Sequence, residues 1–158
     1  MTPLMLILLV EDSPRDAELI LDALGAQQLA NEVLHVRDGA EALDYLYRRG
    51  PFADRPGGHP GLILLDLKLP KVDGLEVLRQ IKGDAALKMI PVVMMTSSRE
   101  EQDLLQSYQL GVNAYVVKPM KFTDFVEAVA KVGAFWGLIN EMPPGSVRRS
   151  VSSGAPQS

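Results

Sequence analysis

The sequence contains no cysteine among its 158 residues, which excludes a disulfide framework, a thiolate metal site and a thiol nucleophile. It has no long apolar segment either, because its continuous apolar runs are far shorter than the roughly 18 to 20 residues that cross a bilayer. No Lys or Arg stands before Arg15, so the start of the sequence lacks the basic region of a secretory signal. We therefore expect a cytoplasmic protein.

Long basic runs are also missing. The chain has 16 Lys and Arg against 20 Asp and Glu, a net charge of -4. Non-specific nucleic-acid binding needs a basic face that neutralises phosphates, so this class of function is disfavoured. A hydrophobic content of 47% over this length fits one domain with a substantial core.

Apolar runs alternate with helical patterns five times along the chain. The run at residues 61–66 shows no polar alternation, which is typical of a strand buried on both faces of a parallel sheet. The predicted strands span residues 4–10, 32–37, 61–66, 91–96 and 113–118. The predicted helices begin near residues 13, 38, 74, 97 and 122, and the last runs to 138. This alternation predicts an α/β fold, a flavodoxin-like doubly wound five-stranded parallel sheet in three layers.

Capping residues and apolar spacing define the first two helices. Ser13 and Pro14 suit the N-cap and first helical positions of one, and Asp38 with Glu41 forms a capping box for the other. The residues expected to face the sheet are Ala17, Leu21 and Leu24 in the first helix and Leu43, Leu46 and Tyr47 in the second.

Four of the five predicted strands end in residues with distinctive chemistry. In order along the chain these are Glu11 and Asp12, then Asp66, Thr96 and Lys118. With strand order 2-1-3-4-5 they become neighbours at the carboxyl edge, where open α/β sheets bind ligands. Carboxylates from two strand ends suit Mg²⁺, which also takes waters and a phosphate oxygen. A lysine and a hydroxyl beside them can bind phosphoryl oxygens, as acyl-phosphate formation on an aspartate requires.

With these residues in this order, the chain resembles the receiver domains of two-component response regulators over residues 4–139. The turn Leu69-Pro70 with Asp73-Gly74, and Pro119 after the lysine, belong to the same pattern. The resemblance implies that Asp66 accepts a phosphoryl group from a histidine kinase. It implies that Asp12, Asp66 and the Lys68 carbonyl bind Mg²⁺, with Glu11 acting through water.

The resemblance also implies roles for the last two strands. Lys118 contacts the phosphoryl group, and the Lys118-Pro119 peptide is cis. Thr96 and Tyr115 form a switch, in which the hydroxyl moves toward the phosphoryl group and the ring turns inward.

Further features resemble, more narrowly, the small single-domain regulators that partner bacterial and cyanobacterial phytochromes. These are the Gly- and Pro-rich loop at residues 50–60, residues 64–70 and the pair Phe135-Trp136. They imply a phosphoprotein that is not an enzyme and that signals by protein contact in a light pathway. A homodimer is expected through the face of the fourth helix, the fifth strand and the fifth helix, because Phe135 and Trp136 cannot both face the sheet, and residues 140–158 are expected to form a disordered tail.

Three alternatives stay open at this point. A phosphatase with an aspartate nucleophile needs an acid two residues later, where this chain has Lys68. A flavin-binding module of the same fold needs a phosphate loop after the first strand, where Glu11 and Asp12 would repel phosphate. The third is a phosphorelay receiver for a kinase that is not a phytochrome.

Overall fold

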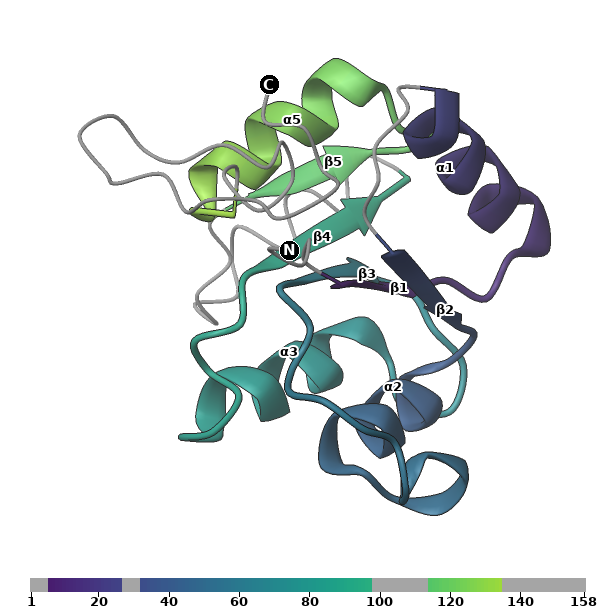
Figure 1. Cartoon of the computed structure of the whole chain (residues 1–158). Coiled ribbons are helices and arrows are strands. Elements are labelled where there is room, and N and C mark those ends of the chain that lie inside the picture. The colour runs from purple at the N-terminus through teal and green to yellow at the C-terminus, as the bar shows by residue number, and fades with distance from the viewer. Residues whose placement is uncertain (1–5, 27–31, 98–113, 135–158) are drawn as a thin grey trace, which may run out of the picture.

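The computed structural model describes residues 6–26, 32–97 and 114–134, with helices on both sides of a central sheet (Figure 1). The strands are β1 (Leu6–Val10), β2 (Glu32–Val36), β3 (Leu62–Asp66), β4 (Val92–Thr96) and β5 (Tyr115–Val117). The helices are α1 (Pro14–Ala26), α2 (Gly39–Tyr47), α3 (Gly74–Gly83), α5 (Phe122–Lys131) and the short 3-10 helix η1 (Gly50–Phe52).

The strand order is β2-β1-β3-β4-β5, and every pairing is parallel. The predicted flavodoxin-like fold is therefore confirmed. All residues of β3 and β4 are buried, whereas β2 at the edge is mostly half-buried. This difference explains why the central strands are continuous apolar runs and β2 is not.

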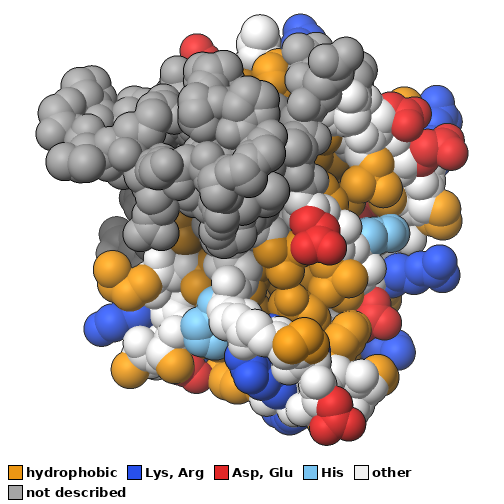
Figure 2. Space-filling view, in the orientation of Figure 1, with side chains coloured by type: hydrophobic (Ala, Val, Ile, Leu, Met, Phe, Trp, Pro, Cys, Tyr) orange, Lys and Arg blue, Asp and Glu red, His pale blue; other side chains and the backbone are white. Residues whose placement is uncertain are grey.

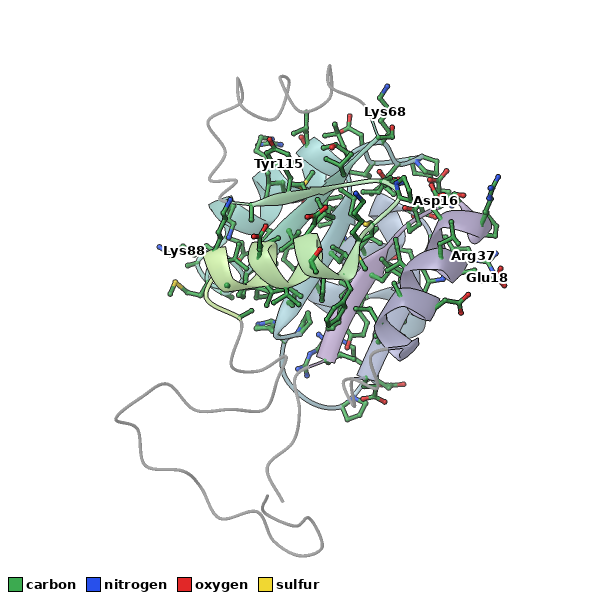
Figure 3. The ribbon with its side chains drawn as sticks, turned by 90° about the horizontal axis from the view of Figure 1, so that it is seen from above. Asp16, Glu18, Arg37, Lys68, Lys88 and Tyr115 are labelled. Carbon is green, nitrogen blue, oxygen red and sulfur yellow. The ribbon has the colours of Figure 1, made fainter. Side chains whose placement is uncertain are left out.

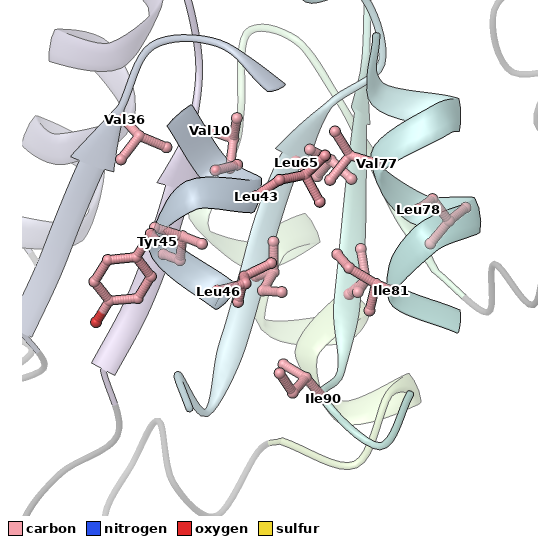
Figure 4. Close-up of a cluster of buried hydrophobic side chains, with 14 of the residues drawn as sticks. Val10, Val36, Leu43, Tyr45, Leu46, Leu65, Val77, Leu78, Ile81 and Ile90 are labelled. Carbon is pink, nitrogen blue, oxygen red and sulfur yellow. The ribbon is translucent and has the colours of Figure 1, made fainter. Parts of the chain in front are cut away.

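Alternation along each strand divides the core between the two faces of the sheet. Leu8 and Val10 of β1 point to the side of α2 and α3, where they pack with residues such as Leu46 and Ile81 (Figure 4). Ile7 and Leu9 point to the opposite side, which α1 and α5 cover. The carboxyl ends of β1, β3, β4 and β5 are left as the edge where loops and side chains can form a site.

One of the predicted inward residues is wrong, and another is only half-buried against the core. In α1 the sheet face is Ala17, Ile20 and Leu24, whereas Leu21 is 37% exposed. Both sets have helical spacings of three and four, so the packing of α1 on the sheet decides whether residue 20 or residue 21 is buried. In α2, Leu43 and Leu46 are buried as predicted, but Tyr45 takes the third position. Tyr47 is half-buried, and its hydroxyl donates to Asp84 Oδ2 at 2.9 Å.

The last helix is shorter than predicted. α5 ends at Lys131, where Gly133 adopts a left-handed φ of 80° and the Ala134 amide bonds back to the Val129 carbonyl at 3.0 Å. Three predictions concern residues that the structure does not describe. They are the helix at residues 97–110, apart from its first residue, the pair Phe135-Trp136 and the tail at residues 140–158.

The loop predicted at residues 50–60 contains η1 and is fixed to α2. The Arg55 side chain donates to the Tyr45 carbonyl at 2.7 Å and lies 4.0 Å from the centre of the Tyr45 ring. On the face that Figure 2 shows, acidic and basic side chains are interspersed over the described surface, in keeping with the absence of long basic runs. Within the described ranges, no helix is long and apolar enough to cross a membrane.

Candidate phosphoacceptor and metal site

The carboxyl end of β1 places two acids in different environments. Glu11 is fully buried, and the Ser13 amide that opens α1 donates to its Oε2 at 3.0 Å. Asp12 is exposed at the mouth of the site. The pair thus offers one carboxylate that is held in place and one that is accessible to water and ions.

Asp66 ends β3 beside these acids and is only 6% exposed. Burial, and after it the charge of Glu11, raise the pKa of Asp66 to about 7, although Lys118 opposes both. Glu11, Asp12 and Asp66 each offer an oxygen, and these oxygens lie within 4.8 Å of one another. The structure therefore brings together the three predicted carboxylates.

Lys118 follows β5 and reaches across the carboxyl ends of β4 and β3. Its Nζ lies 2.7 Å from Glu11 Oε1 and 3.2 Å from Asp66 Oδ2, and the side chain is 13% exposed. Burial alone lowers the pKa of Lys118, but its bonds and charge contacts with Glu11 and Asp66 outweigh burial and leave this pKa raised. Lys118 is thus a permanent cation, and its bond to Pro119 is cis as the resemblance implied.

The donor set fits a hard divalent cation. Three carboxylates at one strand edge supply oxygens only, which Mg²⁺ prefers, and exposed Asp12 leaves a side open to water. Lys68 lies two residues after Asp66, with its amide directed at Asp66 Oδ1 at 3.4 Å. Lys68 is exposed (Figure 3), and it lines the same opening as Asp12.

Thr96 and Tyr115 occupy the neighbouring strands. Thr96 ends β4 fully buried, and its Oγ1 has no hydrogen-bond partner among the residues described. Tyr115 begins β5, pairs in register with Met94, and packs half-buried against the core on the side of α3 (Figure 3). A buried hydroxyl without a partner at the edge of a charged site is well placed to bond an incoming oxygen.

A family model for the response regulator receiver domain matches residues 7–130, most of the chain. The chain belongs to the response regulator receiver family. The predicted resemblance is thereby confirmed, and with it the role of this domain in two-component signalling, where receiver domains take phosphate from sensor histidine kinases.

Relatives of known identity agree with this assignment. The response regulator Rcp1 of Synechocystis is 42% identical over 134 residues, which cover 85% of this chain and 90% of that protein. The solved structure of the bacteriophytochrome response regulator AtBRR has 63% identity and a TM-score of 0.84, covering 89% of this chain and all of that one. The Mn²⁺-bound form of Rcp1 has 41% identity and a TM-score of 0.68, with coverage of 89% and 99%.

Sequence reasoning missed one residue of this receiver site. Asp16, on the first turn of α1 (Figure 3), accepts from Lys118 Nζ at 3.2 Å. In the sequence Asp16 is only an acid in the first turn after Ser13, whose hydroxyl accepts from the Asp16 amide at 3.2 Å. The signal available was its place on the helix that begins directly after Glu11 and Asp12, since the first turn of such a helix overhangs the strand ends.

A cavity of about 430 Å³ opens beside the receiver site, between Asp12 and the connection from β3 to α3. Its floor is largely apolar, formed by Leu67, Leu69 and Leu75, with Lys68 and Asp73 among its charged lining. The cavity therefore borders the receiver site on the side of the exposed acid Asp12.

Proposed function

We propose that Asp66 of this receiver domain accepts a phosphoryl group from a histidine kinase in a Mg²⁺-dependent reaction. The observation that carries the proposal is the position of Asp66 between a cation and a set of metal donors. Lys118 Nζ lies 3.2 Å from Asp66 Oδ2, while oxygens of Glu11 and Asp12 lie within 4.8 Å of a ligand oxygen of Asp66.

Each residue has a distinct task in the proposed transfer. An oxygen of ionised Asp66 attacks phosphorus, the new O–P bond forms, and the P–N bond to the donor imidazole breaks, leaving the electron pair on that ring. Lys118 binds a phosphoryl oxygen by charge and hydrogen bonding, and Thr96 can donate its hydroxyl to another. Asp12, Asp66 and the Lys68 carbonyl would hold Mg²⁺, with Glu11 acting through water; the ion would offset the charge on the phosphoryl oxygens.

The residue two positions after Asp66 supports a signalling role over an enzymatic one. A phosphatase of this type needs an acid there to protonate the leaving group, and Lys68 cannot do so at neutral pH. The acyl phosphate would then persist long enough to be recognised by a partner, so we propose a phosphoacceptor that is not an enzyme.

We propose a bacteriophytochrome-type histidine kinase as the phosphodonor and a cytoplasmic location for the exchange. The support is the likeness to two relatives. AtBRR is described as a bacteriophytochrome response regulator, and Rcp1 is a response regulator of Synechocystis. We also propose a homodimer through the side of β5 and α5, where Val117 is 40% exposed. Thr96 and Tyr115 would carry the phosphorylation signal to that side and to a downstream protein.

The test is phosphorylation by acetyl phosphate followed by intact mass measurement. Wild type should gain one phosphoryl group with Mg²⁺ and none with a chelator, and Asp66→Asn should gain none. Asp22→Asn, which changes an exposed acid of α1, should behave as wild type. Equal incorporation into Asp66→Asn would reject the site, and a light-dependent transfer from a bacteriophytochrome kinase would test the partner.

A further inference from the structure

The turn from β2 into α2 contacts the acid end of β1. We call residues 35–39 the β2–α2 corner. The His35 ring donates from Nε2 to the Glu11 carbonyl oxygen at 2.8 Å, and the Glu11 amide donates to the Val36 carbonyl at 3.1 Å. Both backbone groups of Glu11 are therefore bonded to this corner, although β2 is the edge strand and carries none of the site residues.

The same corner also contacts the connection between β3 and α3. A Cβ atom placed on Gly39 would lie 1.8 Å from the Val72 carbonyl oxygen and 2.7 Å from its carbon. These distances are far shorter than van der Waals contact, so the start of α2 packs directly against the backbone of Val72. Only glycine fits at residue 39 without displacing that backbone. A second link is the ion pair of Asp38 Oδ2 with Lys71 Nζ at 3.6 Å.

This connection, residues 67–73, is short and closed at its ends. The Gly74 amide donates to the Leu67 carbonyl at 2.9 Å, and a Cβ on Gly74 would lie 2.2 Å from the Asp66 carbonyl oxygen. Lys71 is held in a left-handed conformation with φ of 66°. Because both ends of the connection are fixed, a displacement of the backbone at Val72 must shift other residues of the connection, and these include Lys68.

We propose that the β2–α2 corner positions both halves of the metal site, Glu11 and Asp12 through His35 and the Lys68 carbonyl through Gly39. The inference rests on the proposed function, in which these groups surround Mg²⁺. His35 and Gly39 are positioning residues, since neither offers an atom to the metal or the phosphoryl group in this arrangement. Supporting residues outside the ligand set commonly change metal affinity by about 10- to 100-fold.

The first test compares Mg²⁺ affinity of Gly39→Ala with two controls by isothermal titration calorimetry. Gly39→Ala should bind Mg²⁺ about tenfold more weakly or worse, because the added methyl displaces the connection. Gly25→Ala is the matched control, since a Cβ there meets nothing within 4 Å. Leu46→Ala removes a buried side chain of α2 without changing the Gly39–Val72 contact and controls for lost stability; it should keep wild-type affinity.

The second test separates the hydrogen bond of His35 from its bulk. His35→Leu removes the donor to the Glu11 carbonyl and should weaken Mg²⁺ binding severalfold, whereas His35→Gln keeps an N–H at similar reach and should restore most of the affinity. Circular dichroism checks the fold of each variant. This pair still decides the question where Gly39→Ala does not fold.

The outcomes distinguish this inference from the proposed function. Wild type that binds no Mg²⁺ rejects the proposed function. Wild type that binds Mg²⁺, with folded Gly39→Ala and His35→Leu binding equally well, overturns the role of the corner alone. Equal losses in Gly39→Ala and Leu46→Ala, or in His35→Leu and His35→Gln, overturn it too, because the effect would then be general destabilisation.

Discussion

Replacing Asp66 by Asn should stabilise the metal-free protein at neutral pH. Asp66 lies almost fully buried beside Glu11, and burial followed by that neighbouring charge raises its pKa to about 7. An asparagine of nearly the same shape removes the buried charge and leaves Lys118 paired with Glu11 and Asp16. The wild-type residue thus costs stability in exchange for its chemistry.

The pH dependence follows from proton uptake by the two states. Between its ordinary pKa of 3.8 and about 7, Asp66 is ionised in the unfolded chain and protonated in the folded one. The folded state then binds more protons, so stability falls as the pH rises through this window and the loss is complete above pH 7. At about 1.4 kcal/mol for each pH unit, the window corresponds to at most about 4 kcal/mol. Water that reaches the site beside exposed Asp12 screens the charge, so we expect roughly half of this.

The assay is urea unfolding of wild type and Asp66→Asn without Mg²⁺, at about pH 8 and about pH 5. Asp66→Asn should be about 2 kcal/mol more stable at the higher pH, and the gap should shrink at the lower. Asp22→Asn, at an exposed acid of α1, should show little difference at either pH. Mg²⁺ should stabilise wild type more than Asp66→Asn, since it binds the folded site. A variant that is no more stable at about pH 8, or equally stabilised at both pH values, would refute the reasoning.

Other predictions concern single residues of the site. Asp12→Ala should lose most acetyl phosphate labelling, measured by intact mass, because the remaining carboxylates hold Mg²⁺ poorly; labelling that stays at the wild-type level would remove Asp12 from the metal set. Thr96→Ala should accept phosphate yet show no phosphorylation-dependent change in dimerisation or partner binding by sedimentation. If the variant changes on phosphorylation as much as the wild type does, this hydroxyl is excluded from the switch. Gly74→Ala should lower the free energy of unfolding in urea by at least about 2 kcal/mol, because its Cβ would lie 2.2 Å from the Asp66 carbonyl oxygen. Gly83→Ala should leave that free energy nearly unchanged, because a Cβ there meets nothing within 4 Å.

The sheet and its site were predictable because they depend on local signals. Apolar runs that end in polar residues mark strands buried on both faces, and parallel order places their ends at one edge. Glu11, Asp66 and Lys118 were therefore found from the sequence, and their contacts at 2.7 and 3.2 Å agree with it.

The contacts of the supporting residues could not be read from local patterns, because they form across the fold. Gly39 looks like an ordinary residue after an N-cap until α2 is seen to rest on Val72. Asp16 looks like a helix-capping acid until Lys118 reaches it from residues far along the chain. Leu21 and Ile20 differ by one position, and only the packing of α1 on the sheet determines which is buried.

The charges of the site set the order in which its ligands can bind. With Asp66 ionised, the four carboxylates of Glu11, Asp12, Asp16 and Asp66 face one ammonium, Lys118, and leave a net charge of minus three. A phosphoryl group brings up to two further negative charges into a partly buried site, where repulsion is weakly screened. A divalent cation held by these carboxylates would offset most of this excess and would favour the ionised form of Asp66, which is the form that we propose attacks phosphorus. Metal binding should therefore precede phosphoryl transfer. Lys118 is already paired with three carboxylates, so it should contact the phosphoryl oxygens only when the cation neutralises part of the carboxylate charge.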